Sequence, residues 1–519
     1  MRKACYSLVR RTHNVRQTQI RSLATTAPAP PSVQITTLPN RIRVATESTP
    51  AYFSSVGLYV DAGSRYETDD ILGSTHFLDR MAFKSSRSRS DEEMSAAVHS
   101  LGGQILCSSS REAIMYQSSH FHQGTPLAAE LIADTVLNPE FLPEELEAQR
   151  DAARYEIREL SAKPEMILPE ILHGVAYNHK GLGKSLLCPE HRIEAIDGPT
   201  LRRAMAHWYR PERMVVAGAG MPHEQLVELT DKYFSSLKSL PAPGPSLTYR
   251  PNTPQQQAPT NLLSSSAPSV TKTLTRAASY LFPATHNDAP GRLNPDSDYT
   301  GGHLFIPNET SEFDHLYVAY EGVGIHHDDV YTVATMQVLL GGGGSFSAGG
   351  PGKGMYSRLY TSILNHFPQV DHCASFHHIY SDSSLFGLFA SFDSKARGGN
   401  TPTQILPHLI HQLSLLLYTP IPEQELSRAK NQLKSSLMMS LESQAIQVED
   451  LGRQILVQGR KVPVSEMVKK IDLITPQEVR RVASTIFGLQ SGAKPTIVCM
   501  GQDDIGDYHK AFRTYGLAV

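Results

Sequence analysis

The stretch YFSSVGLYVDAGS, at residues 52–64, carries the pattern that decides the fold class. Its first part, residues 52–60, is rich in aromatic and β-branched residues and predicts a strand. Asp61 and Gly63 are turn residues that end this strand, and an apolar periodicity of the helical type follows at residues 71–83. A strand, a turn and a helix in this order favour a mixed α/β architecture.

The same order of elements recurs in the second half of the chain. Residues 316–320 (LYVAY) predict a strand, residues 321–324 a turn and residues 329–340 a helix. We therefore expect an α/β fold, an α+β sandwich that is built twice. Two apolar runs of strand length lie at residues 214–219 and 496–500. Further helical patterns lie at residues 91–101, 126–138, 143–160, 199–207, 403–417, 424–442 and 476–487.

A proline-rich segment separates the two halves. Ten of the 34 prolines fall between Pro241 and Pro295, among Gln, Ser and Asn, and no periodicity survives there. This composition is typical of linkers, so we expect a linker with a partly disordered insertion at residues 240–298. The predicted domains then span residues 33–239 and residues 299–519.

The N-terminal region differs in charge from the rest of the chain. Residues 1–40 hold six Arg and Lys and no acid, and the remaining 42 basic and 51 acidic residues leave the body at a net charge of −9. An Arg-rich, Ser/Thr-bearing and acid-free leader is typical of a mitochondrial transit peptide, which we place, with a short tail, at residues 1–32. The alternative is a basic arm that binds anions.

Composition also limits the cellular setting. No run of about 18 apolar residues occurs, so no transmembrane helix is predicted. The whole-chain charge of −3 argues against a dedicated nucleic-acid binder. Outside the leader four cysteines are scattered without a C-x-x-C pair, which fits a reducing compartment such as the mitochondrial matrix.

The sequence HFLDR, from His76 to Arg80, is an inverted zinc motif with one ligand replaced. In H-x-x-E-H, two imidazoles on one helix face bind zinc, and the carboxylate activates the bound water. Arg80 takes the place of the second imidazole, and a guanidinium cannot become a ligand. Glu156 could add a ligand from a later helix, but zinc needs about three. The set His76, Asp79, Arg80 and Glu156 therefore predicts a disarmed site, with a plain Arg80–Glu156 salt bridge as the alternative.

Residues 341–354 (GGGGSFSAGGPGKG) form a loop with 8 glycines in 14 positions, and a helical segment is predicted after it at residues 355–360. No G-x-x-x-x-G-K-[ST] or G-x-G-x-x-G register closes, and nucleotide-binding loops follow strands rather than helices, so a phosphate cradle is excluded. Ordering so many glycines is entropically costly. We expect a mobile flap whose bare backbone approaches an extended peptide, with a passive connection as the alternative.

Residues 341–360 closely resemble the glycine-rich segment of the alpha subunits of mitochondrial processing peptidases. The similarity continues through residues 61–67, 209–220 and 430–457, which are shared more widely among pitrilysin-type proteins, including core subunits of respiratory complex III. The resemblance covers roughly residues 35–238 and 300–510 and leaves out an insertion at residues 262–298. It implies two homologous pitrilysin-type α/β domains, the first with a degenerate zinc motif and the second with the glycine-rich loop.

The resemblance also implies a function. The chain would be no enzyme on its own and would need no cofactor. It would hold presequences of imported precursors in the mitochondrial matrix while a catalytic beta subunit, which carries the zinc, cleaves them. The acidic body favours capture of basic presequences. A structural core subunit of complex III is the alternative. The resemblance implies that the substrate-binding residues are Gly341, Gly342, Gly343, Gly344, Ser345, Phe346, Ser347, Ala348, Gly349, Gly350, Pro351, Gly352, Lys353, Gly354, Glu442, Glu449 and Asp450. The three acidic residues could instead form a solvated helix face.

Overall fold

The computed structural model describes residues 33–48, 52–239, 297–309, 311–344, 355–393, 395 and 401–519. Residues Ser32–Val519 form one compact unit. The predicted transit peptide, nearly all of the predicted linker and residues 345–354 of the glycine-rich loop lie outside the described residues. Within the described ranges, no helix is both long and apolar enough to cross a membrane.

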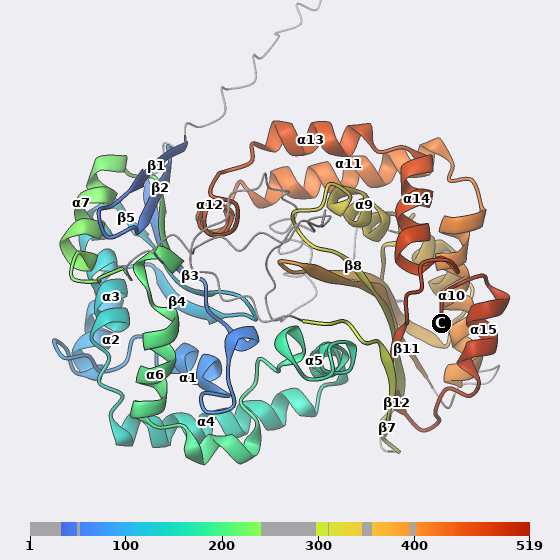
Figure 1. Ribbon diagram of the computed structural model, residues 1–519, viewed down its shortest axis with the longest axis horizontal. Coiled ribbons are helices and arrows are strands. Elements are labelled where there is room, and N and C mark those ends of the chain that lie inside the picture. Colours follow the sequence, from blue (N-terminus) through green and yellow to red (C-terminus); the bar gives the residue numbers. More distant parts are fainter. Residues whose placement is uncertain are drawn as a thin grey trace, which may run out of the picture. The chain divides into compact units, whose positions relative to one another are not determined.

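The first half is built on a six-stranded sheet with the order β1-β2-β6-β3-β5-β4 (Figure 1). Its strands are β1 (Val33–Thr37), β2 (Arg43–Glu47), β3 (Phe53–Val60), β4 (Gln104–Ser109), β5 (Ile114–Phe121) and β6 (Met214–Ala219). The helices of this half are α1 (Ser74–Arg80), α2 (Asp91–Ser100), α3 (Thr125–Leu137), α4 (Pro143–Ser161), α5 (Pro164–Ala176), α6 (Gly198–Trp208) and α7 (His223–Phe234).

The second half has a six-stranded sheet with the order β7-β12-β8-β11-β10-β9. Its strands are β7 (Gly302–Pro307), β8 (Phe313–Val323), β9 (Gly342–Gly344), β10 (Val370–Ile379), β11 (Ser383–Asp393) and β12 (Thr496–Gly501). The helices of this half are α9 (Val330–Leu340), α10 (Pro402–Tyr418), α11 (Glu423–Ser440), α12 (Gln444–Gln458), α13 (Val464–Leu473), α14 (Pro476–Phe487) and α15 (Tyr508–Thr514).

The two sheets share one topology. The order β2-β6-β3-β5-β4 in the first matches β7-β12-β8-β11-β10 in the second, with a parallel first pair and antiparallel pairs after it in both. The α/β class and the doubled architecture predicted from element order are therefore confirmed. β1 extends one sheet and β9, made of glycines from the predicted loop, extends the other at the opposite edge.

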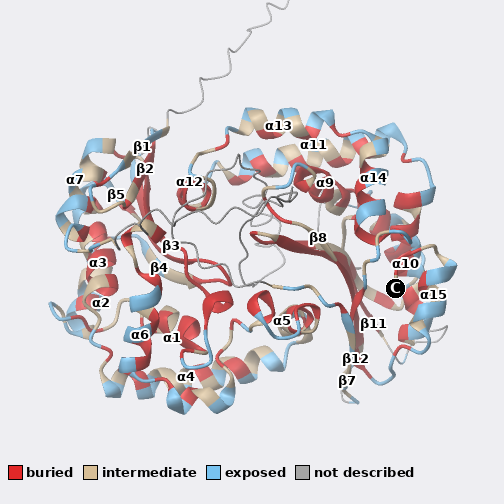
Figure 2. Ribbon diagram, in the orientation of Figure 1, coloured by how far each residue is buried: buried red, intermediate tan, exposed pale blue. Residues whose placement is uncertain are grey.

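Each half contributes one helix that packs on the sheet of the other half. The central strands are buried along nearly their whole length, as for β6 and β8, so both faces of each sheet need cover (Figure 2). Helices of the same half cover one face and build the main cores. On the other face, α12 packs on β2, β3 and β6 through Val448, Leu451 and Ile455, and α5 packs on β12 and β8 through Leu168 and Leu172.

The helices predicted from periodicity are present, with ends that shift by a few residues. The helix predicted at residues 71–83 is shorter, Ser74–Arg80, and the one predicted at residues 355–360 is wrong in its first part, because Met355 and Tyr356 form a turn. A π-helical turn, η7 (Tyr360–Leu364), follows there. The sequence did not predict the helices α5, α7, α12, α13 and α15, or the strands β1, β2, β4, β5, β7 and β11.

Candidate functional site

Helix α1 holds the degenerate metal set, and a buried carboxylate fixes where this helix begins. Glu67 accepts backbone N–H bonds from Gly73 (2.9 Å) and Thr75 (2.7 Å) at the start of α1. Carboxylates stabilise the free N–H groups of a helix start. Gly73 has φ of +89°, and a Cβ there would lie 2.4 Å from the sulfur of Cys188, so glycine is required at this position.

His76, Arg80 and Glu156 lie together in the structure. His76 Nε2 lies 3.2 Å from Glu156 Oε2, and the Arg80 guanidinium forms an ion pair with the same oxygen. The hydrogen bond from His76 is the first cause that lowers the pKa of Glu156; the charge of Arg80 lowers it further, and burial opposes the shift. The structural Arg80–Glu156 salt bridge, which the sequence left as the alternative, is therefore present, and Arg80 stands at the motif position of the second imidazole.

The tautomer of His76 is fixed by a backbone group. The Cys188 N–H points at His76 Nδ1 over 3.1 Å. Because an amide N–H can only donate, Nδ1 is the acceptor and carries no proton, so Nε2 carries the proton and donates to Glu156. Metal-binding imidazoles have the reverse arrangement when they ligate through Nε2, with Nδ1–H donating to an acceptor. The surroundings of His76 are thus arranged for a hydrogen bond rather than for a metal.

Asp79 anchors α1 to the sheet. Its Oδ2 accepts the backbone N–H of Ser109, at the end of β4, over 2.7 Å. This carboxylate therefore has a structural partner at the position where the inverted zinc motif places its water-activating Glu. Among the described residues, no group of three or more His, Cys, Asp or Glu side chains is arranged to hold a metal ion.

The start of the glycine-rich loop is built into the second sheet. Gly341 ends α9 with φ of +60°, and Gly342 has φ of +106°. Ser375 N–H donates to the Gly341 carbonyl (2.8 Å), and the Gly342 N–H donates to Ser357 Oγ (3.0 Å). The base of the loop is therefore closed between Gly342 and Ser357, with residues 345–354 between them along the chain. The sequence predicted a loop for all of residues 341–354, whereas Gly342–Gly344 form the edge strand β9.

The three predicted acidic contacts differ in exposure. Glu442, between α11 and α12, is exposed. Glu449 is mostly covered and forms an ion pair with Arg453 (2.8 Å). Asp450 is fully buried, bonded by Lys461 and Gln454, and burial raises its pKa. Glu442 is thus the one of these three whose carboxylate faces solvent in this chain.

Comparison with known proteins identifies the family. The model for insulinase (peptidase family M16) matches residues 43–190, and the model for the peptidase M16 inactive domain matches residues 195–433. The chain belongs to the M16 peptidase family. It is 42% identical over 505 residues to the mitochondrial-processing peptidase subunit alpha of Neurospora crassa, with 89% of this chain and 85% of that one covered. The Homo sapiens subunit alpha is 34% identical over 475 residues, with 90% and 82% covered.

These relatives confirm the resemblance to processing-peptidase alpha subunits. One chain of a solved structure, Complex III2 from Candida albicans with Inz-5 bound, has a TM-score of 0.72 over 93% of this chain and all of that chain. Its sequence identity is 18%, so this similarity shows the M16 fold alone. The relatives and the match to the inactive domain agree with a non-catalytic member of the family.

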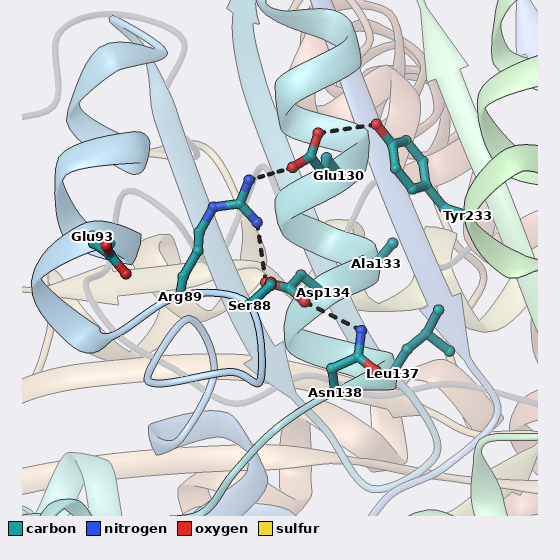
Figure 3. A pocket seen from close by; sticks show the side chains of 9 residues that line it. All are labelled: Ser88, Arg89, Glu93, Glu130, Ala133, Asp134, Leu137, Asn138 and Tyr233. Atoms are coloured by element: carbon teal, nitrogen blue, oxygen red, sulfur yellow. Dashed lines mark hydrogen bonds and ion pairs between the residues drawn. The ribbon is translucent and has the colours of Figure 1, made fainter.

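An open pocket of about 560 Å³ lies beside α3 in this M16 chain (Figure 3). The Arg89 guanidinium bonds both Glu130 and Asp134 there, and Tyr233 donates to Glu130. Glu93 accepts the Ser90 N–H at the start of α2. Every carboxylate of the pocket is therefore already bonded within the chain. The pocket is lined by Ser88, Arg89, Glu93, Glu130, Ala133, Asp134, Leu137, Asn138 and Tyr233.

The sequence analysis missed what the motif DAGSRYE (residues 61–67) does in this M16 chain. Asp61 accepts from Tyr66 (3.0 Å), and Glu67 marks the start of α1. Arg65 is fully buried and pairs with Glu112 from the first half and Asp382 from the second. The sequence could have indicated this ion pair, because Arg65 is a charged residue that comes soon after a strand predicted to be buried.

Proposed function

We propose that this M16 chain is the substrate-recognition subunit of a heterodimeric mitochondrial-processing peptidase of the matrix. It holds the N-terminal presequences of imported precursors, and a beta subunit that carries the zinc cleaves them. The observation that carries the proposal is the Arg80–Glu156 ion pair, at the point where an active M16 chain needs a ligand. Relatives at 33–42% identity are named as alpha subunits of this peptidase.

We assign presequence contact to the glycine-rich loop, residues 341–354, and to Glu442. The closed base formed by Gly342 and Ser357 supports this assignment, because it leaves the loop attached at a defined place on the second sheet. Glu442 supports it because its carboxylate is exposed to basic peptides. Glu449 and Asp450 are less suited to direct contact, since each is bonded by a basic residue of this chain.

The role is tested by reconstitution. This chain and a candidate beta subunit are purified separately, and cleavage of a labelled precursor is measured with each alone and with the two together. We expect cleavage by the pair only, and inhibition of the pair by a chelator. Chelator-sensitive cleavage by this chain alone would overturn the proposal.

The role of the loop needs its own variant. Replacing residues 345–354 with a three-residue Ser/Asn linker keeps β9 and the bond between Gly342 and Ser357. We expect precursor affinity to fall at least tenfold while the heterodimer still assembles. The matched control is a seven-residue deletion within the insertion at residues 262–298. Cleavage that is the same in both variants removes the loop from the function.

A structural subunit of complex III is the second candidate. It is favoured only by the similarity of fold to the Candida albicans chain, at 18% identity. The higher identity to processing-peptidase alpha subunits, over most of both chains, favours the first candidate.

A further inference from the structure

A buried ionic cluster joins the two halves of the chain. It consists of Arg65 and Glu112 from the first half and Ser381 and Asp382 from the second, and we call it the Arg65 clasp. Arg65 Nη1 lies 2.5 Å from Glu112, 2.6 Å from Ser381 Oγ and 2.8 Å from Asp382 Oδ1, and Nη2 pairs with Asp382 Oδ2. The Ser381 hydroxyl and its backbone N–H both donate to Glu112, the latter over 3.2 Å.

A buried ionic cluster of this kind adds little to the free energy of unfolding, but it fixes the relative positions of the groups that it joins. The side chains of Arg65 and Glu112 are completely buried, and moving charges out of water costs most of what their attraction returns. A planar guanidinium that bonds two carboxylates and a hydroxyl accepts only one relative placement of these groups. The clasp therefore specifies how the turn between β10 and β11 is placed against the first half.

That turn lies at one end of β10, and the base of the glycine-rich loop lies beside the other end of the same strand. Ser381 and Asp382 follow the end of β10 (Val370–Ile379), and the start of β10 pairs with β9, where His372 lies opposite Gly344. On the other side, Arg65 lies two residues before Glu67, which fixes the start of α1. One strand therefore connects the clasp to the base of the loop, and one short segment connects the clasp to the degenerate metal set.

We propose that Arg65 and Asp382 are positioning residues, which set the place of β9, the described base of the glycine-rich loop, relative to α1 and so the affinity for the presequence. This inference rests on the proposed function of the loop. In this proposal neither residue acts by contact with the peptide; the Arg65 side chain is fully buried, and 22% of the Asp382 side chain is exposed. They act through β10, whose two ends are held by β9 and by the clasp.

The test uses the full heterodimer with the variant Asp382→Asn, which removes one charge of the clasp without changing its volume. The matched control is Asp134→Asn, because Asp134 is likewise paired with an arginine and with serine hydroxyls but lies wholly within the first half. We expect Asp382→Asn to raise the KM for a precursor roughly three- to thirty-fold with kcat little changed. Asp134→Asn is expected to leave KM unchanged, and Asp382→Glu to recover most of the wild-type KM.

A distance measurement separates positioning from loss of stability. Spin labels are placed at Gly343→Cys, where a Cβ meets nothing within 4 Å, and at Ala148→Cys on an exposed site of α4. We expect the distance distribution between them to broaden or shift in Asp382→Asn and not in Asp134→Asn. Where Asp382→Asn does not fold, Ser381→Ala is the milder variant, since it removes only the hydroxyl that joins Glu112 to Arg65.

The outcomes distinguish this inference from the proposed function. If the loop replacement weakens binding but Asp382→Asn matches Asp134→Asn in both KM and distances, the clasp does not position the loop and the inference is wrong. If the loop replacement leaves cleavage unchanged, the proposed role of the loop fails. The inference then fails as well, unless the changes in KM among the Arg65-clasp variants still parallel the changes in the distance between the spin labels.

Discussion

The substitution Arg80→His tests how completely the metal set has been lost. On ligand count alone it restores the site, because His76, the new imidazole and Glu156 would supply the three ligands that zinc needs. A reading of sequence alone would thus expect tight zinc binding. The surroundings of His76 lead us to expect the opposite.

The reason is the proton on His76. To ligate zinc through Nε2, the ring must move its proton to Nδ1, where the Cys188 N–H points over 3.1 Å. Two donors would then face each other and one hydrogen bond would be lost, at a cost of about 1–3 kcal/mol. A mismatched partner of a metal-binding His typically weakens metal binding by about 10- to 100-fold. Asp79, already bonded by the Ser109 N–H, is also a methylene shorter than the Glu that activates water in the intact motif.

We therefore expect Arg80→His to bind zinc at least about tenfold more weakly than an intact M16 site and to cleave no precursor. Zinc affinity is measured by competition with chromogenic chelators of graded affinity, followed by metal analysis after dialysis. Glu156→Gln in the Arg80→His background is the control, since it removes the third ligand and any site-specific binding with it. One zinc per chain that survives dialysis, with an affinity equal to that of an intact site, would refute the reasoning about the tautomer.

Three further predictions concern the scaffold. Gly341→Ala should lower the free energy of unfolding by about 2 kcal/mol, because φ is +60° and a Cβ would lie 2.3 Å from Ser357 Cβ. Gly343→Ala is the control and should change the free energy of unfolding by less than about 0.5 kcal/mol, because a Cβ there meets nothing within 4 Å. Urea denaturation measures both values. Gly452→Ala should cost about 1–3 kcal/mol and lower Tm, because its Cβ would strike the Tyr59 ring at 2.1 Å where α12 packs on the first sheet, and an unchanged Tm would contradict that packing. Burial raises the pKa of Glu112 to about 7, from 4.5, so the folded state holds a proton that the unfolded state releases, and stability should fall by up to about 3 kcal/mol between pH 4.5 and 7. Urea midpoints at pH 5 and pH 8 should show this decrease in the wild type, and Glu112→Gln should reduce it.

The predictable part of the fold was set by local patterns. Helices such as α14 (Pro476–Phe487) have one apolar face and a capping box at Thr475, so the sequence gives both their period and their start. Strands β6 and β12 are continuous apolar runs between turn residues. These elements were enough to predict an α/β fold that is built twice.

Two of the missed helices, α5 and α12, depend on contacts with the other half. Helix α12 carries Asp450 and Arg453, which suggest a solvated face, yet both are buried on the first sheet. Asp450 is tolerated there because Lys461 pairs with it, and that pairing is not visible in local periodicity. Strand β10 carries His372, His377 and His378 among apolar residues, and its place between β9 and β11 of the same half is not visible in local periodicity.

The candidate site also has features that the sequence could predict and features that depend on distant parts of the chain. That Arg80 cannot ligate a metal followed from the motif, because residue type and helical spacing decide what can ligate, and its pairing with Glu156 was the alternative that the sequence left open. The tautomer of His76 did not follow, since it depends on the backbone of Cys188, 112 residues away. The structural use of Asp79 depends in the same way on Ser109. A sequence could indicate that a ligand was missing, but not that the remaining ligands had taken other partners.

The loss of a metal site need not weaken the helices that once held it. In an active inverted zinc site the ion joins the motif helix to the later helix that supplies a carboxylate. Here Arg80 and His76 on α1 both bond Glu156 on α4, so a cation and a hydrogen bond join the same two helices. Glu156 therefore has a structural role in this chain that does not require catalysis. It follows that Glu156→Gln in the wild-type background should loosen α1 against α4, with faster amide exchange in α1, whereas added zinc or a chelator should leave that exchange rate unchanged.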